Sequence, residues 1–271
     1  MTRNEVFNRI VHLLSSHYGE REANSIARIY IEDIYDIHLP DEDEVNIHIR
    51  QLISGFPVQY LAGRVYFYDR FFKVTRDTLI PRPETEEWMH HIIQSQSNKS
   101  GLRILDVGTG SGCIAITLYR HLLQADITAI DISEGALMVA EENAGRHNSR
   151  IHFIKMDFID EAQRETLPHF DLIVSNPPYV GDDEEDLMGR GVSTYEPGIA
   201  LFAGSDPLIF YKALALFGLT HLKPGGLIYA EINEYKMEET LKIFIEMNYR
   251  AEVLTDIQGK PRVIEAELTL Y

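Results

Sequence analysis

A predicted strand and a predicted helix meet in the stretch Leu105-Asp106-Val107-Gly108-Thr109-Gly110-Ser111-Gly112. Glycine has no Cβ, so the backbone can turn sharply here and a ligand can approach the main chain closely. The spacing is G-x-G-x-G, which differs from the G-x-G-x-x-G of a dinucleotide site, and no Lys-Ser or Lys-Thr pair follows as in a phosphate-binding loop. Taken alone, the stretch indicates either a small-molecule site or only a tight turn.

The sequence on both sides of this loop alternates between patterns typical of strands and patterns typical of helices. We expect strands at residues 102–107, 126–131, 150–154, 170–175 and 226–231, and helices at 112–122, 133–146, 206–221 and 234–247. Two more β-rich runs, at 250–256 and 261–269, predict a closing hairpin. Regular alternation favours an α/β fold, in which a mostly parallel sheet has helices on both faces and an antiparallel pair at one edge.

The first 56 residues show helical spacing instead. Apolar residues recur at intervals of three and four in groups that begin at Val6, Ile26 and Val45. The segment Leu39-Pro40-Asp41-Glu42 combines a stop signal with an N-cap for the next helix. Three or four short helices, packed as a small bundle, are therefore expected.

A linker is predicted between the two patterns. Aromatic and β-branched residues from Arg64 to Val74 surround a turn at Tyr68-Asp69-Arg70 and indicate a β-hairpin. A helix is expected from Pro83 to about Ser95, with acids in its first turn. The predicted division is a helical domain at residues 1–56, a linker with a hairpin at 57–83, and an α/β domain at 84–271.

The charge of the chain bears on its partners. Its 271 residues include 42 acidic and 25 basic side chains, for a net charge of −17, and no basic run. Because duplex nucleic acid is held mainly by Lys and Arg on phosphates, this balance favours a protein or small-molecule substrate over nucleic acid. The acid-rich loop Asp182-Asp183-Glu184-Glu185-Asp186 is either a solvated face or a contact for a basic partner.

A cytoplasmic location is expected. No apolar run approaches the roughly 20 residues of a membrane span, so no membrane partner is expected. The first residues contain no apolar core followed by a small-residue cleavage site. The single Cys113 excludes an intrachain disulfide and a cysteine-based metal cluster, and the predicted chemistry needs no metal.

Two positions after the glycine loop indicate an adenosine cofactor. Asp131 ends the second predicted strand, 21 residues after Gly110, where an acid can bind both hydroxyls of a ribose. Asp157 and Phe158 follow the next strand, where a carboxylate and an aromatic ring can face an adenine. Because no element would cradle a pyrophosphate, S-adenosylmethionine fits better than a dinucleotide.

The segment Ser175-Asn176-Pro177-Pro178-Tyr179 supplies the predicted acceptor site at the end of another strand. Its two prolines keep the chain extended and stiff. The Asn176 side-chain oxygen and the Pro177 carbonyl can each accept a hydrogen from an –NH2 group, and Tyr179 can pack on a flat target. Such acceptors orient a poorly nucleophilic amide nitrogen and stabilise the charge that grows as it attacks the methyl carbon.

These residues resemble those of the class I S-adenosylmethionine-dependent methyltransferases that modify planar nitrogens. A more specific resemblance, to the peptide chain release factor glutamine N5-methyltransferases, covers nearly the whole chain from about residue 56. It is carried by Pro57-Val58-Gln59-Tyr60-Leu61-Ala62-Gly63, Leu79-Ile80-Pro81-Arg82-Pro83-Glu84-Thr85-Glu86, Tyr195-Glu196-Pro197 and the closing Asp256, Gly259 and Arg262.

The resemblance implies a Rossmann-like class I methyltransferase sheet and a helical domain that recognises the substrate. It also implies methylation of the glutamine in the Gly-Gly-Gln loop of class 1 release factors, with S-adenosylhomocysteine as the second product. The candidate cofactor-binding residues are Gly108, Thr109, Gly110, Ser111, Gly112, Asp131, Asp157, Phe158 and Asn176. The candidate substrate-binding residues are Asn176, Pro177, Pro178 and Tyr179, of which Asn176 and Pro177 are the candidate catalytic residues.

Some alternatives stay open at this point. Arg82 and Glu84 either serve the site or clamp the linker to the catalytic domain, and Glu196 either lines the substrate groove or braces its loop. The Asn-Pro-Pro-Tyr motif is shared with N6-adenine DNA methyltransferases, which act on a flipped base. A non-catalytic cofactor- or partner-binding protein of the same fold is the third possibility. The chain is expected to act as a monomer.

Overall fold

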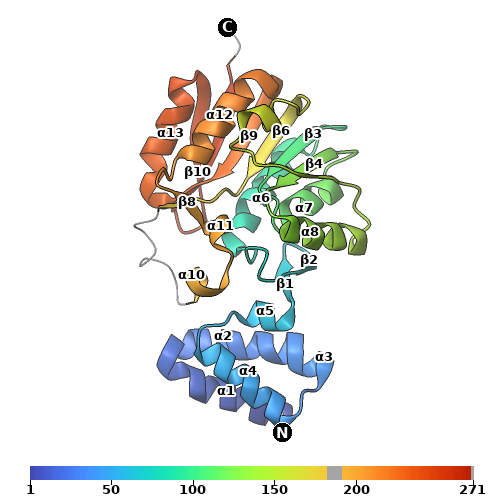
Figure 1. Cartoon of the computed structure of the whole chain (residues 1–271), viewed down its shortest axis with the longest axis vertical. Helices are drawn as coiled ribbons and strands as arrows, with labels where there is room; N and C mark the ends of the chain where they lie inside the picture. The colour runs from blue at the N-terminus through green and yellow to red at the C-terminus, as the bar shows by residue number, and fades with distance from the viewer. Residues whose placement is uncertain (182–190, 270–271) are drawn as a thin grey trace.

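A seven-stranded sheet forms the centre of the α/β part in the computed structural model, which describes residues 1–181 and 191–269 (Figure 1). The strand order is β10-β11-β9-β6-β3-β4-β5. The strands are β3 (Arg103–Val107), β4 (Asp126–Asp131), β5 (His152–Lys155), β6 (Phe170–Ser175), β9 (Leu222–Glu231), β10 (Tyr249–Thr255) and β11 (Pro261–Leu268). The strands from β5 to β9 are parallel, and the hairpin β10–β11 runs antiparallel to β9. The predicted fold is confirmed.

The strand order reverses beside β3. The chain adds β4 and β5 on one side of β3 and then returns to pair β6 with its other side. Val107 and Ser175 are paired at the carboxyl ends of β3 and β6, and the Ser175 hydroxyl donates to the Val107 carbonyl at 2.8 Å. Such a reversal opens a crevice at the carboxyl ends of the strands, where ligands of α/β sheets bind.

Helices cover both faces of the sheet. Neighbouring residues of β3 face opposite sides, because Ile104 belongs to one hydrophobic cluster and Leu105 to the other. The Ile104 cluster includes side chains of α6 (Pro83–Gln96) and α7 (Cys113–His121), whereas the Leu105 cluster includes side chains of α12 (Ile209–His221) and α13 (Met237–Glu246). Burial on both faces explains why the central strands β3 and β6 are mostly apolar, whereas the edge strand β5 is largely exposed.

The N-terminal helices form a bundle with its own hydrophobic core. They are α1 (Arg3–Tyr18), α2 (Glu20–Tyr30), a π-helical turn (Ile31–Tyr35), α3 (Asp36–His38), α4 (Glu42–Ile53) and α5 (Val58–Ala62). Asp41 caps α4 as predicted, since its side chain accepts a hydrogen bond from the Glu44 amide at 2.9 Å. Helix α5 lies in the segment predicted as a linker and was not predicted. Pro57 stands just before its first turn, where a proline is tolerated.

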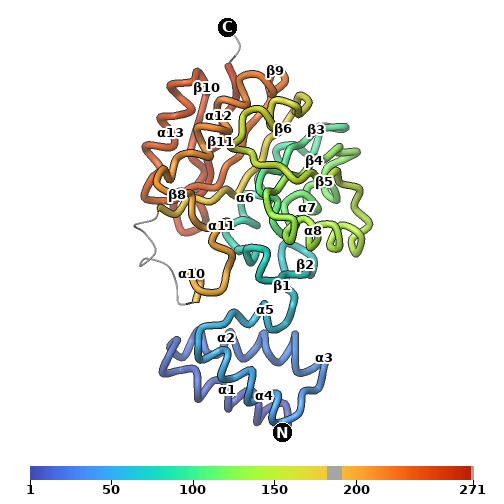
Figure 2. The backbone as a smooth tube through the Cα atoms, in the orientation of Figure 1, coloured from blue at the N-terminus to red at the C-terminus, as the bar shows by residue number. Residues whose placement is uncertain are grey.

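The bundle and the sheet lie at opposite ends of the molecule, with the linker hairpin between them (Figure 2). Strands β1 (Arg64–Phe67) and β2 (Arg70–Lys73) pair antiparallel, which confirms the predicted hairpin. An ion pair of 2.6 Å between Arg64 and Asp33 joins the hairpin to the bundle. None of the helices in residues 1–181 and 191–269 is long and apolar enough to cross a membrane.

Short elements between β6 and α12 were not predicted. They are β7 (Val180–Gly181), α10 (Val192–Tyr195), α11 (Gly198–Leu201) and β8 (Phe202–Gly204), and α9 (Glu161–Arg164) was missed before β6. Helix α12 begins at Ile209 instead of residue 206, since the Asp206 side chain accepts from the Leu208 amide in a turn. Helix α8 (Glu134–Arg146) matches its prediction closely, and the predicted helix at 234–247 is a 3₁₀ turn (Glu234–Lys236) followed by α13. The acid-rich loop Asp182–Asp186 lies outside the described residues.

Two helical glycines test the packing of the fold. A Cβ added at Gly218 would lie 2.3 Å from the Tyr249 hydroxyl and 2.8 Å from Ile228 Cδ1, so Gly218→Ala should lower the free energy of unfolding by about 1–3 kcal/mol. A Cβ at Gly145 in α8 would meet nothing within 4 Å, so Gly145→Ala should raise the free energy of unfolding by about 0.5–1 kcal/mol. Denaturant titration of both variants measures this, and equal shifts in the two would contradict the packing of α12 on the sheet.

Candidate active site

The glycine loop after β3 owes its spacing to its backbone conformation. Gly108, Gly110 and Gly112 have φ angles of +72°, +56° and +79°, a region that other L-residues rarely adopt. A Cβ at Gly108 or Gly110 would meet nothing within 4 Å, whereas one at Gly112 would lie 3.1 Å from Ala140 Cβ in α8. Gly112 therefore serves the close packing of α7 on α8, and the first two glycines expose the backbone.

Asp131 at the end of β4 holds the glycine loop. Its Oδ2 accepts a hydrogen bond from the Gly110 amide and its Oδ1 one from the Ser133 amide, both at 2.9 Å. Burial raises the pKa of this carboxyl group, and the backbone hydrogen bonds act in the opposite direction. A carboxylate has about four lone-pair positions, so each oxygen can still accept a hydrogen bond from a ligand.

One cavity brings most of the candidate cofactor residues together. Its lining includes, from that set, Gly108, Thr109, Gly110, Ser111, Asp131, Asp157, Phe158 and Asn176, together with Pro178. Gly112 is not part of this lining. The Phe158 ring is buried and packs edge-on against Phe217, with 5.4 Å between the ring centroids, so it forms a fixed wall of the cavity.

A second cavity adjoins the first. It is lined by Leu79, Arg82, Asn176, Tyr179, Val180, Val192, Ala200 and Leu201. The two cavities share Leu79, Asn176 and Ala200, so they meet at these three residues, of which Asn176 alone has a polar side chain. Pro177 is buried and lines neither cavity. Groups bound in the two cavities would therefore approach one another at Asn176.

The linker supplies one wall of the first cavity, which the sequence analysis missed. The lining includes the linker residues Asp77, Thr78, Leu79 and Pro81. Buried Glu196 holds this segment in place, because its carboxylate accepts from the Ile80 amide at 3.0 Å and from Arg82 at 2.5 Å. Of the two alternatives, the structure therefore shows Glu196 bracing the linker, and Arg82 both clamping it and lining the second cavity.

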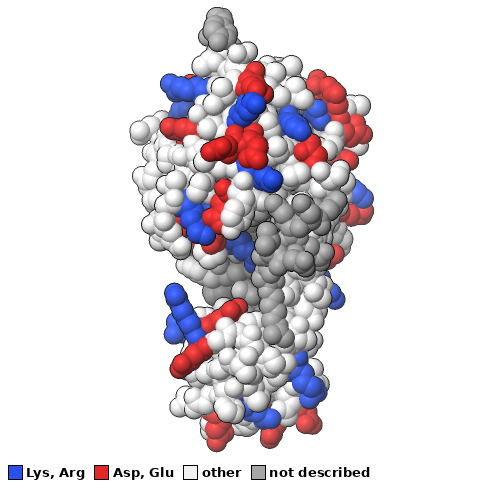
Figure 3. Space-filling view, turned by 90° about the vertical axis from the view of Figure 1, so that its left-hand side faces the viewer, with Lys and Arg blue, Asp and Glu red and all other residues white. Residues whose placement is uncertain are grey.

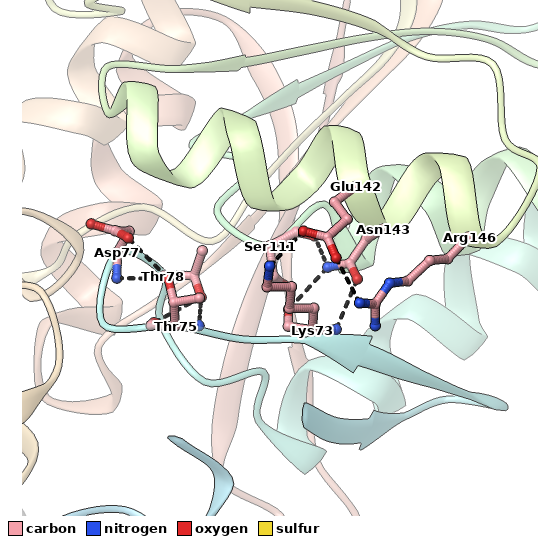
Figure 4. A network of polar contacts seen from close by, with 8 residues as sticks. All are labelled: Lys73, Thr75, Asp77, Thr78, Ser111, Glu142, Asn143 and Arg146. Carbon is pink, nitrogen blue, oxygen red and sulfur yellow. Dashed lines mark hydrogen bonds and ion pairs between the residues drawn. The ribbon is translucent and has the colours of Figure 1, made fainter. Parts of the chain in front are cut away.

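A second buried contact joins the linker, at Lys73, to the glycine loop (Figure 4). The Asn143 side chain on α8 accepts from the Lys73 amide at 2.8 Å, and it donates to the carbonyls of Lys73 and Ser111 at 3.0 and 2.9 Å. Asn143 is fully buried. A polar residue on the buried side of a helix was the one signal that could have identified it, and its partners were not evident from the sequence.

Charged side chains of both signs lie on the surface. On the face shown in Figure 3, Lys and Arg lie among Asp and Glu and form no continuous basic stripe. Inside the protein, Asp106 lies beneath the glycine loop, and burial raises the pKa of its carboxyl group to about 7. The Thr109 hydroxyl donates to Asp106 at 2.7 Å, which favours the charged form but does not offset the burial.

Comparisons with known proteins agree with this geometry. Residues 89–190 match the family model described as "Methyltransferase small domain". The chain is 37% identical over 276 residues to a release factor glutamine methyltransferase of Flavobacterium psychrophilum, covering 95% of this chain and 96% of that one. It is 42% identical over 221 residues to that of Bacteroides thetaiotaomicron, covering 80% of this chain and 78% of the other.

A solved structure of a Pyrococcus furiosus methyltransferase shares the fold. It aligns with a TM-score of 0.55 and 18% sequence identity, covering 83% of this chain and 99% of that chain. At this level of identity the likeness shows the fold and nothing of the substrate.

The raised pKa of Asp106 predicts a pH effect on stability. The unfolded chain releases this proton near pH 3.8, whereas the folded protein keeps it to about pH 7, so folding is disfavoured as the pH rises between these values. The free energy of unfolding of Asp106→Asn, minus that of the wild type, should therefore increase by about 2 kcal/mol from pH 5 to pH 8. Urea titrations across this range measure it, and a difference that does not change with pH would contradict the assignment.

Proposed function

Because this chain belongs to the release factor glutamine methyltransferases, we propose how its residues carry out the transfer of a methyl group from S-adenosylmethionine to a glutamine side chain of a release factor. The acceptor atom is the amide nitrogen N5 of the glutamine in the Gly-Gly-Gln motif of class 1 release factors. The observation that supports the residue roles is the meeting of two cavities at Asn176.

The first cavity fits the cofactor. Gly108 and Gly110 expose the backbone, and Asp131 keeps free lone pairs for two hydroxyl donors. Phe158 and the other apolar side chains offer a wall for a flat base. When bound, S-adenosylmethionine supplies a methyl group on a cationic sulfur. We assign Thr109, Ser111 and Asp157 to the same cavity, and Gly112 to the packing beneath it.

The second cavity receives the glutamine side chain. Leu79, Val192 and Leu201 offer apolar contacts for its methylene groups, and Asn176 lies where the cavity opens toward the cofactor. The Asn176 oxygen accepts one amide hydrogen, which orients the nitrogen lone pair and stabilises the positive charge that develops on nitrogen. We keep the Pro177 carbonyl as the candidate second acceptor, which the substrate amide would have to reach from beside the second cavity because Pro177 lines neither cavity. Tyr179 lines the second cavity and shapes the pocket around the amide, whereas Pro178 lines the first.

The setting of the reaction follows from its substrate. A release factor works in translation, so we propose a cytoplasmic location and a bundle at residues 1–56 that grips the protein substrate. Because residues of one chain line both cavities, we propose that the enzyme acts as a monomer.

Incubation with labelled methyl donor and either a release factor or duplex DNA tests which substrate is methylated. Label on the DNA alone would overturn the proposal.

Asn176→Ala should abolish methyl transfer, with turnover reduced by at least about 100-fold, because the amide nitrogen loses its orienting acceptor. Cofactor affinity should stay nearly intact, since Asn176 is one of many residues around the first cavity. Single-turnover kinetics and calorimetry measure the two quantities. Unchanged turnover would remove Asn176 from the catalytic site.

Asp131→Ala should weaken cofactor binding by about tenfold or more, because the cofactor loses an acceptor for its ribose and the Gly110 amide loses its partner. Calorimetric titration with S-adenosylhomocysteine measures the affinity without turnover. Glu134→Ala, which removes an exposed acid of the same region that pairs with Lys155, is the control and should bind normally. Equal affinity of Asp131→Ala and the wild type would contradict the ribose assignment.

A further inference from the structure

A buried carboxylate lies behind the acceptor site, and the proposed mechanism does not use it. Glu231 ends β9, is 4% exposed and belongs to a segment that the sequence analysis left without a role. Its Oε2 accepts hydrogen bonds from the Thr85 hydroxyl at 2.7 Å and from Trp88 Nε1 at 2.9 Å, both on α6. A buried acid needs such partners to be tolerated, so the arrangement fixes which way the Thr85 hydroxyl points.

The Thr85 hydroxyl has a single hydrogen to donate. This hydroxyl donates it to Glu231 Oε2, so the hydrogen is not available to Asn176. The lone pairs of Thr85 Oγ1 can then only accept. Asn176 Nδ2 lies 3.5 Å from Thr85 Oγ1, at the long end of hydrogen-bond distances.

This chain of contacts sets the orientation of the Asn176 amide. With its –NH2 group on Thr85, the planar side chain presents Oδ1 on its other side. A flipped amide would set Oδ1 against Thr85 Oγ1 with no hydrogen between the two oxygens. It would also present an –NH2 group to the –NH2 group of the substrate, which cannot accept in the required geometry.

We propose that Glu231 and Thr85 are positioning residues that hold the Asn176 amide with its oxygen toward the substrate nitrogen. The inference rests on the proposed role of Asn176 and adds the reason why this asparagine selects an –NH2 acceptor. Neither residue needs to touch the reacting atoms. The carboxylate determines the direction of the hydroxyl, and the hydroxyl determines the direction of the amide.

Substitutions at Thr85 test the first step. Thr85→Val keeps the shape and removes the hydroxyl, so kcat with a release factor should fall about tenfold while KM changes by less than about threefold. Thr85→Ser restores the hydroxyl and should recover most of kcat. Thr240→Val is the matched control, because Thr240 in α13 is fully buried, donates to the carbonyl of Lys236 in the preceding 3₁₀ turn and should leave kcat unchanged.

Substitutions at Glu231 give the sharper test. In Glu231→Met the Thr85 hydroxyl loses its acceptor and becomes free to donate to Asn176 Oδ1, which stabilises the wrong orientation. The loss of kcat should therefore exceed that of Thr85→Val. The double variant Glu231→Met with Thr85→Val lacks the misdirected donor, so it should be more active than Glu231→Met alone. A role in stability alone predicts the opposite order.

Wild type and Asn176→Ala are assayed alongside, and thermal unfolding and cofactor affinity are measured for each variant. A wild type that labels no release factor would overturn the proposed function itself. An active wild type with an inactive Asn176→Ala, but with a Thr85→Val variant of normal kcat, would overturn only the positioning role. A double variant that is less active than Glu231→Met would also overturn the positioning role. A double variant that is more active than Glu231→Met supports this role.

Discussion

The pairing of β3 with β6 is the constraint on which the site depends. Parallel strands lie about 4.8 Å apart, so the loops after β3 and β6 must be neighbours. Strands β4 and β9 flank this pair, and the four strands present Asp131, the glycine loop, Asn176 and Glu231 in one row along their carboxyl ends. The residues proposed to bind the methyl donor, to hold the acceptor and to support it therefore follow in the order of the strands.

The linker forms part of the wall of both cavities. The sheet alone leaves the crevice open, and residues 77–81 close one side of both cavities. Two buried polar side chains hold the linker, Asn143 at Lys73 before this segment and Glu196 at Ile80 within it. Because buried polar groups are costly without partners, these contacts permit few alternative positions of the linker. The linker therefore connects the bundle to a wall of the first cavity.

Prediction from sequence was most successful where the signal is local. The glycine conformations, the Asp41 cap and the apolar strands depend on neighbours a few residues away, and all were anticipated. It failed for contacts between distant residues. Glu196 and Ile80 are 116 residues apart, Asn143 and Lys73 are 70 apart, and Glu231 and Thr85 are 146 apart. Neither hydrophobic periodicity nor secondary-structure propensity predicts contacts between such distant residues.

The sequence by itself determined the type of fold, the methyl donor and the motif that we propose to hold the acceptor, because strand periodicity, glycine spacing and Asn-Pro-Pro-Tyr are local features of the chain. Only the tertiary structure decided that Gly112 serves packing, that the linker forms a wall of the site, and that Glu231 stands behind Asn176. The physical reason is that hydrogen bonds to buried polar groups depend on which elements meet in space, and that is settled by the order of strands in the sheet.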